Sequence, residues 1–299
     1  MKTLLETLKA GAGYLDKRGI EEARLNMEHL LAHVLECRRL ELYLRFSQSM
    51  REDDLETLRG LVKRRGEGEP LQHLLGSVEF CGHELVCDHR ALVPRPETER
   101  LVELLLERFA VRAPASVLDV GTGSGCIGLS LAKAWTGKGT NFTLADVSED
   151  ALELARLNAS RLALDGTAVR ILRSDLFEKT AGQFDLVVAN LPYIPAAEIP
   201  VLSAEVRRDP IRALVGGPSG TEIIARLIAG CLAHLTPGGT VALEVGHDQA
   251  AAVAALCADA GLADVETARD LQGVERFVWA MRPRDAVVQH IRPQQNSPR

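Results

Sequence analysis

The tetrapeptide Asn-Leu-Pro-Tyr at residues 190–193 holds the side chains best suited to chemistry. It follows the apolar run 184–189, typical of a buried strand, and its proline ends that strand. Asn190 therefore lies at the carboxyl end of a strand, where open α/β sheets bind ligands. Its side-chain oxygen and a nearby backbone carbonyl could accept both hydrogens of a substrate –NH2 group, with Tyr193 covering the flat group. This favours chemistry on a planar nitrogen, but also fits a strand that ends in a proline turn with a core tyrosine.

A glycine-rich turn joins the predicted strand 116–120, the first strand of the α/β region, to an apolar helix. The turn reads Gly121-Thr122-Gly123-Ser124-Gly125. Glycines at this position let a ligand approach the backbone and the helix N-terminus. Residues 123–128 also spell G-x-G-x-x-G, so a dinucleotide-binding enzyme is an alternative. Glycines at 121, 123 and 125 instead follow the pattern of enzymes that bind S-adenosylmethionine (SAM).

Acidic residues follow or end three of the predicted strands. Asp146 ends its strand and suits a ribose diol in either nucleotide interpretation. Asp175 and Leu176 follow the strand 169–172 and are placed for the edge and the face of an adenine. Asp119, just before the glycine turn, could orient the methionine end of the donor or the turn itself. Each acid could instead be a helix cap or a surface charge.

Strand and helix patterns alternate from Ala115 onward, which predicts an α/β fold with a parallel sheet covered on both faces. Four regions are expected. Residues 1–75 show helical spacing and predict a small domain of four or five short helices, and 76–93 predict a β-hairpin linker. Residues 94–281 form the α/β domain, and the polar, proline-bearing residues 282–299 predict a disordered tail.

Local signals predict where several elements begin and end. Gly11 and Gly13 are expected to end the first helix. Thr98 is expected to cap a helix over 99–109, and Ser148 to cap the helix after Asp146. A loop of roughly 30 residues after Tyr193 is long enough to suggest a function.

Composition limits the class of protein. The chain has 299 residues, 46% apolar and 25% charged, as in globular proteins. A net charge of −6 gives no general attraction to nucleic acid or anionic membranes. Six cysteines without a CxxC pair fit no zinc site, and His29 and His33 lack a third ligand nearby, so we expect no metal. No apolar run approaches the ~18 residues of a membrane helix, and the N-terminus has no signal-like core, so we expect a cytoplasmic protein.

With these features together, the chain resembles the release-factor glutamine methyltransferases, the PrmC/HemK family. The resemblance is carried by the helical N-terminal region, Leu92–Glu99, Gly121–Gly125 and Asn190–Tyr193, with further matching pieces at 76–80, 216–220 and 243–246. It implies a seven-stranded class I SAM-dependent methyltransferase domain, Rossmann-like in fold, behind a helical domain that docks the protein substrate.

The resemblance also implies an activity, N5-methylation of the glutamine in the Gly-Gly-Gln tripeptide of class I peptide chain release factors. It places Gly121 to Gly125, Asp146, Leu176 and Asn190 in the SAM pocket. It assigns the substrate glutamine to Asn190, Leu191, Pro192 and Tyr193, with Asn190 and Tyr193 as the catalytic pair. We expect a monomer that forms no stable complex with nucleic acid.

This chain departs from the family pattern at two places. The family usually has Pro where this chain has Leu191, and residues 205–210 only approximate its Asp-Val-Arg-x-x-Pro stretch. Asn-Leu-Pro-Tyr also resembles the motif of ribosomal RNA adenine dimethyltransferases. An adenine N6 methyltransferase is therefore the main alternative, and a non-catalytic SAM-binding regulator is a second one.

Overall fold

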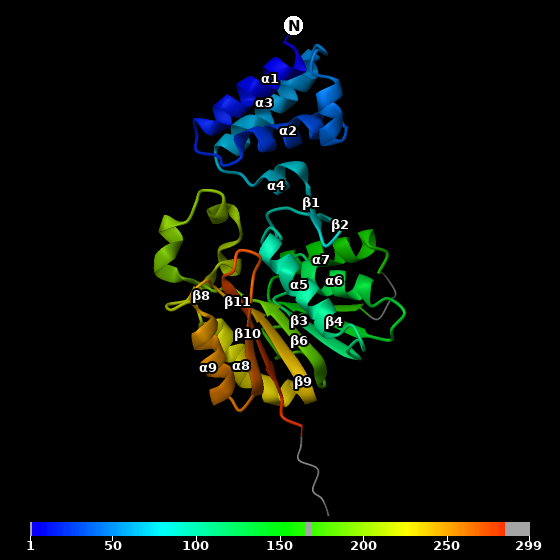
Figure 1. Cartoon of the computed structure of the whole chain (residues 1–299), viewed down its shortest axis with the longest axis vertical. Coiled ribbons are helices and arrows are strands. Elements are labelled where there is room, and N and C mark those ends of the chain that lie inside the picture. Colours follow the sequence, from blue (N-terminus) through cyan, green and yellow to red (C-terminus); the bar gives the residue numbers. More distant parts are fainter. Residues whose placement is uncertain (1, 165–168, 285–299) are drawn as a thin grey trace, which may run out of the picture.

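The computed structural model describes residues 2–164 and 169–284 of the chain. It shows a group of helices stacked on an α/β unit built around one large sheet (Figure 1). Most of the predicted tail, from residue 285 onward, lies outside the described residues. None of the helices formed by the described residues is long and apolar enough to span a membrane.

The N-terminal region is helical, as predicted, and has a hydrophobic core of its own. That core includes Leu4, Met27, Leu30 and Leu58. Its elements are α1 (Leu4–Asp16), α2 (Ala23–Val34), the 3-10 helix η1 (Arg39–Leu44), α3 (Glu52–Gly66) and α4 (Leu71–Leu75).

The predicted end of the first helix at Gly11 and Gly13 is wrong, because α1 continues to Asp16. Gly11 lies against the side chain of Met27 on α2, where a Cβ atom would overlap the sulfur and the methyl group. This glycine therefore permits a close approach of two helices rather than a helix end.

The predicted hairpin is confirmed as β1 (Ser77–Phe80) and β2 (His83–Val86), which pair antiparallel. Helix α5 (Pro96–Arg108) follows, with Pro96 in its first turn, where the missing N–H of proline costs no hydrogen bond. The prediction that Thr98 caps this helix is wrong. Thr98 lies inside the first turn, buried, and its hydroxyl donates to Glu244, 146 positions away in the sequence.

The large sheet has seven strands in the order β10-β11-β9-β6-β3-β4-β5, which confirms the predicted fold class. Strands β9, β6, β3, β4 and β5 run parallel, while β11 pairs antiparallel with β9 and β10. The strands are β3 (Ser116–Val120), β4 (Asn141–Asp146), β5 (Val169–Arg173), β6 (Phe184–Asn190), β9 (Leu235–Glu244), β10 (Ala263–Arg269) and β11 (Glu275–Met281).

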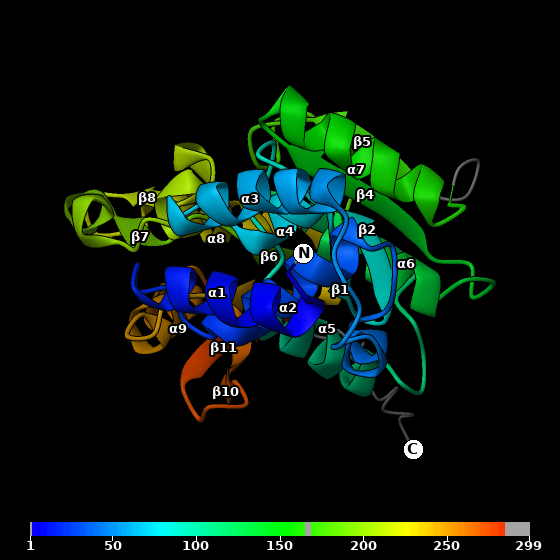
Figure 2. The same ribbon diagram turned by 90° about the horizontal axis from the view of Figure 1, so that it is seen from above.

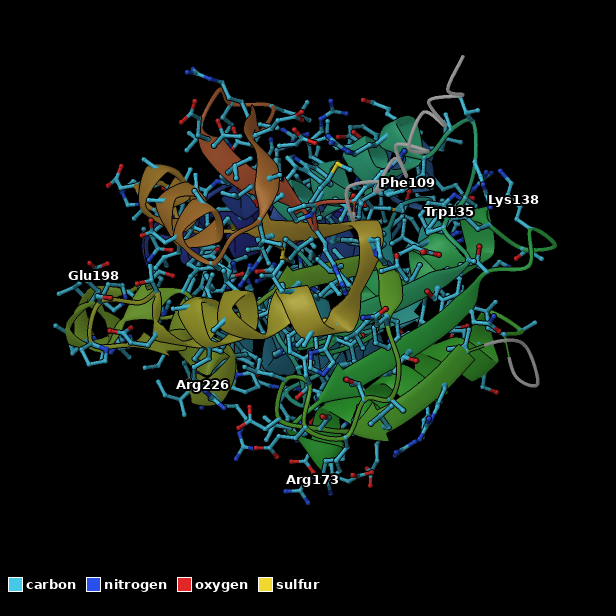
Figure 3. The ribbon with its side chains drawn as sticks, turned by 90° about the horizontal axis from the view of Figure 1, so that it is seen from below. Phe109, Trp135, Lys138, Arg173, Glu198 and Arg226 are labelled. Atoms are coloured by element: carbon cyan, nitrogen blue, oxygen red, sulfur yellow. The ribbon has the colours of Figure 1, made fainter. Side chains whose placement is uncertain are left out.

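Helices cover both faces of this sheet, as the near-continuous apolar strands require. Alternate residues of β6 point to opposite faces: Leu186 and Val188 pack with α5 and α6, whereas Val187 and Ala189 pack with α8 and α9. Phe109 after α5 lies beside Trp135 after α6, with ring centroids 6.0 Å apart (Figure 3). The remaining helices are α6 (Cys126–Ala134), α7 (Glu149–Arg161), α8 (Glu222–His234) and α9 (Ala250–Asp259).

The long loop after β6 has structure of its own and reaches the helical region. Arg65 of α3 donates to the Glu205 carboxylate at 2.6 Å, and Arg208 donates to the backbone oxygen of Glu67 at 3.2 Å. Figure 1 shows the yellow-green loop extending from the sheet toward the helices. Its elements are β7 (Ile194–Pro195), η2 (Ala196–Val201), η3 (Val206–Arg208), η4 (Ile211–Ala213) and β8 (Val215–Gly217), with β7 and β8 paired parallel.

The strand order reverses between β3 and β6, near the middle of the sheet. Strands β5 and β10 form its two edges and lie on opposite sides of the molecule in Figure 2. Val120 pairs with Ala189, so the glycine turn after β3 and Asn190 at the end of β6 are neighbours. Ligands of open α/β sheets bind at such a switch point. The topology therefore brings together the two sequence motifs that suggested chemistry.

Candidate active site

The glycine turn adopts backbone conformations that glycine allows without steric cost. Gly121, Gly123 and Gly125 have φ angles of 70°, 57° and 84°. Gly125 is the N-cap residue of α6, and the amides of Gly121 and Thr122 both donate to the carbonyl of Ala145 in β4. These bonds hold the turn against the end of the neighbouring strand.

Asp119, near the end of β3, stabilises this turn through hydrogen bonds. Its buried carboxylate accepts from the Thr122 hydroxyl at 2.6 Å and from the Gly128 amide at 3.0 Å. Burial raises the pKa of Asp119 to about 6. One contact is in the glycine turn and the other is in the first turn of α6. These contacts fit the expectation that Asp119 orients the glycine turn.

Asp146 closes the other side of the turn. Its two carboxylate oxygens accept from the backbone amides of Gly123, at 3.0 Å, and Ser148, at 2.8 Å. Burial raises the pKa of this carboxyl group. Ser148 also caps α7, as predicted, because its hydroxyl accepts from the Ala151 amide. Asp146 is thus fixed at the tip of β4, facing a cavity.

That cavity has a volume of about 380 Å³, within the ~300–1,000 Å³ range of small-molecule pockets. Gly125 does not line it, and a Cβ atom on this residue would meet Leu129 at 2.7 Å. Every other residue predicted to bind the cofactor does line it, namely Gly121, Thr122, Gly123, Ser124, Asp146, Asp175, Leu176 and Asn190. The Asp175 carboxylate also pairs with Arg226 of α8 at 2.8 Å, and both residues line the cavity. Figure 3 labels Arg226.

A second cavity, of about 340 Å³, adjoins the first. Tyr193 lines this smaller cavity and not the larger one, whereas Pro192 lines only the larger one. Asn190 and Leu191 contribute to the walls of both. The four residues 190–193 therefore line two adjoining cavities, and Asn190 lies at the boundary between them.

The side chain of Asn190 is held by two residues that are remote in sequence. Its Nδ2 donates to the Thr98 hydroxyl at 3.0 Å, and that hydroxyl donates to Glu244 Oε2 at 2.8 Å. Burial raises the pKa of Glu244 to about 7. Neither Thr98 nor Glu244 was predicted as a site residue, although both lie in segments that resemble the family.

A second buried carboxylate holds the proline-rich segment before α5. The fully buried side chain of Asp209 accepts from Arg95 at 2.7 Å and from the Val93 amide at 3.2 Å. The sequence alone did not indicate this contact between the long loop and the segment 93–95. It fixes the wall that Arg95 contributes to both cavities.

The two departures from the family pattern also have structural counterparts. Leu191 is buried in the core, and its Cδ2 lies where a Cβ on Gly121 would approach within 2.7 Å. In the stretch 205–210, Glu205 meets Arg65 and Asp209 meets Arg95. Leucine at 191 therefore fills space beside the glycine turn, and the acids of the loop fasten it at two points.

This doubly wound sheet, with a glycine-lined cavity at its switch point and an Asn-x-Pro-Tyr tip, defines a methyltransferase of the class that uses SAM. A family model described as the PrmC N-terminal domain matches residues 6–76, and one described as the methyltransferase small domain matches residues 95–204. These matches favour the SAM interpretation of the glycine turn over the dinucleotide one.

Curated relatives identify the family. The release factor glutamine methyltransferase of Geobacter sulfurreducens is 39% identical over 280 residues, which cover 92% of this chain and 95% of that protein. The enzyme of the same name from Deinococcus radiodurans is 39% identical over 279 residues, covering 93% and 98%. The chain belongs to the release factor glutamine methyltransferase family.

A solved structure supports the fold independently. The 16S rRNA N2 G1207 methyltransferase of Thermus thermophilus, in complex with AdoMet and guanosine, aligns with a TM-score of 0.51 at 20% identity. The alignment covers 69% of this chain and 49% of that one. At this identity the similarity concerns the fold alone.

Proposed function

We propose that this protein transfers the methyl group of SAM to N5 of the glutamine in the Gly-Gly-Gln tripeptide of class I peptide chain release factors. The observation that carries the proposal is the position of Asn190, in the wall shared by two adjoining cavities. A methyl donor in the larger cavity and a glutamine side chain in the smaller one would meet at this residue.

The larger cavity fits SAM. A Cβ atom on Gly123 would meet only Ala91, at 3.8 Å, so the backbone of the turn faces open space. Both oxygens of Asp146 accept one backbone amide each, and each has a further lone pair for a ribose hydroxyl. Asp175 and Leu176 would receive the adenine. When bound, SAM supplies a methyl group on a positively charged sulfur.

The smaller cavity fits a glutamine side chain. Its walls include Tyr193, Leu202 and Leu214, apolar surfaces for the aliphatic stem, and it ends at Asn190 and Leu191. The Asn190 Oδ1 and the Leu191 carbonyl would accept the two hydrogens of the amide –NH2 group. Burial raises the pKa of Tyr193 to about 12, so its hydroxyl stays neutral and the ring serves as a flat packing surface.

Catalysis would come mainly from positioning. The two acceptors aim the nitrogen lone pair at the methyl carbon, so that the N–C bond forms as the S–C bond breaks. They also stabilise the positive charge that develops on the nitrogen. The resulting N-protonated amide is very acidic and releases its proton to water after transfer, so the site needs no strong base.

Mass spectrometry of a release factor incubated with the enzyme and SAM tests the proposal. We expect a gain of one CH2 group, located by fragmentation on the glutamine of the tripeptide. A methyl group on any other residue, or none, would contradict the proposed function.

The adenine alternative is tested in the same experiment by adding ribosomal RNA and labelled SAM. We expect label in the release factor and none in the RNA, because the chain carries a net charge of −6 and lacks a general basic footprint. Label in the RNA alone would favour the alternative.

We further propose that residues 1–75 form a domain that docks the release factor, joined by the linker 76–93 to the catalytic domain 94–281. Its separate core and two exposed leucines, Leu40 and Leu44, support this role. A partner that works in translation favours a cytoplasmic location, and the net charge of −6 favours a protein without stable nucleic-acid binding.

The docking role can be tested with the double substitution Leu40→Ser and Leu44→Ser. We expect KM for the release factor to rise about tenfold, as when two apolar contacts are lost, with kcat unchanged. Leu271→Ser, at a leucine that is 84% exposed in the turn between β10 and β11, is the matched control and should leave KM unchanged. An unchanged KM in the double variant would remove this surface from the docking site.

A further inference from the structure

We propose that Thr98 and Glu244 are positioning residues that fix the side-chain amide of Asn190 with its oxygen facing the substrate. The inference rests on the function proposed above and extends it to two residues outside the Asn-x-Pro-Tyr motif. Thr98 lies in the wall of the larger cavity and Glu244 in the wall of the smaller one, but their polar atoms bond to each other and to Asn190, so we assign both an effect through Asn190.

The direction of each hydrogen bond follows from the donors available. An ionised carboxylate only accepts, so the single proton of the Thr98 hydroxyl goes to Glu244 Oε2, 2.8 Å away. Thr98 can then only accept from Asn190, and the amide must present its –NH2 group, at 3.0 Å. The Asn190 oxygen is therefore turned away from Thr98. Among the described residues no donor to this oxygen is recorded, so it remains available to a substrate.

The three residues come from three elements that the fold holds rigidly together. Asn190 ends β6 and pairs with Glu244 at the end of β9, while Thr98 lies in the first turn of α5. Thr98 and Glu244 are each only 2% exposed. Buried polar groups of this kind normally serve a specific partner, and Thr98 does not cap its helix. The partner it serves is Asn190.

The charge state of Glu244 would control the orientation. The charged or titratable groups near it are Glu97 on α5, Cys126 on α6, Arg276 on β11, and Arg95 and Tyr193 in the wall of the same cavity. Arg276 is also paired with Asp270, at 2.8 Å. Burial outweighs Arg276 and raises the pKa of Glu244 to about 7. Below that pH the protonated carboxyl can donate to Thr98, whose own proton is then free to turn toward Asn190.

The carboxylate that dictates the amide orientation is present above the raised pKa and is lost as the pH falls through it. We expect kcat to decline by about tenfold between pH 8 and pH 6, following one group with an apparent pKa near 7. The substrate amide itself does not titrate in this range.

Thr98→Val and Thr98→Ser separate the hydroxyl from the shape of the side chain. We expect the valine variant to lower kcat by roughly tenfold, the upper range for one net hydrogen bond, with the Kd for SAM changed less than twofold. The serine variant should restore kcat to within about twofold of wild type. Thr140→Val removes another buried hydroxyl bond, to the Pro114 carbonyl, and should leave kcat unchanged. This control separates orientation from general loss of stability.

Glu244→Gln completes the test, because glutamine keeps an acceptor for Thr98 but does not titrate. We expect its kcat to vary less than twofold between pH 6 and pH 8. Wild-type kcat in Thr98→Val, or an unchanged decline below pH 7 in Glu244→Gln, would overturn the inference. The wild-type enzyme is assayed before any variant. If it leaves the release factor unmethylated, the proposed function fails, and this result is distinct from a failure of the inference on Thr98 and Glu244.

Discussion

The two cavities that meet at Asn190 are built in different ways. The larger one includes the glycine turn, residues 121–124, and Asp146 in its wall accepts from the backbone amides of Gly123 and Ser148. The smaller one is walled by side chains from segments that are remote in sequence, including Arg95, Tyr193 and Glu244. Binding of the donor should therefore depend on backbone conformation, whereas binding of the glutamine should depend on individual side chains.

The largest effect is expected at the boundary between the cavities. Asn190→Ala removes the acceptor for the substrate amide and should lower turnover by at least ~100-fold, comparable to losing one oriented catalytic hydrogen bond. The Kd for SAM should change much less, because the glycine turn remains. Turnover and Kd are measured by methyl transfer to release factor and by calorimetry. Asn141→Ala, at an exposed position on β4, is the control. Wild-type-like turnover in Asn190→Ala would contradict the proposal that donor and substrate meet at Asn190.

A backbone change in the glycine turn should act mainly on the larger cavity, which the turn lines. Gly121→Ala places a side chain at a φ of 70° and a Cβ within 2.7 Å of Leu191 Cδ2. The left-handed conformation alone costs roughly 1–2 kcal/mol, so relaxation of the turn should weaken SAM binding about tenfold.

The matched control is Gly139→Ala, which has a similar φ of 76° but no atoms within 4 Å of the added Cβ. It should lower stability to a similar extent without changing the Kd for SAM, both measured by calorimetry. Equal affinity in the two variants would show that the turn tolerates a side chain, against the account.

The smallest effect is expected where the helical region holds the long loop. Glu205→Gln keeps an acceptor for Arg65 but removes the charge from a pair in which the Arg65 side chain is only 5% exposed. Because this loop carries part of the smaller cavity's wall, KM for the release factor should rise about threefold, while SAM affinity stays constant. Steady-state kinetics measures both. Glu198→Gln, on the exposed part of the same loop, should leave KM unchanged (Figure 3). A raised KM in the control as well would point to general loosening of the loop.

The sequence predicted those parts of the molecule that depend on local patterns. Apolar strands alternating with helices predicted the fold, and the glycines after Val120 predicted a ligand turn. Asn190 could be placed at a strand end because Pro192 cannot continue the strand. Neighbouring strands then brought both motifs together, as the order of the sheet confirms.

The contacts that hold the site could not be predicted, because they join residues far apart in the chain. Thr98 has the residue type of a helix cap, yet its hydroxyl reaches Glu244, 146 positions away. Gly11 reads as a helix end, yet it allows α1 to approach Met27. Single-sequence patterns report on neighbours within about one helical turn or strand pair, so such long-range packing leaves no local signal.

The most direct test of the account is a crystal structure of the enzyme with S-adenosylhomocysteine and a Gly-Gly-Gln peptide. We expect the demethylated cofactor over residues 121–124 in the larger cavity and the peptide glutamine in the smaller one. Its amide nitrogen should lie ~3 Å from both Asn190 Oδ1 and the Leu191 carbonyl oxygen. A glutamine bound away from Asn190, or an Asn190 oxygen turned toward Thr98, would contradict the account.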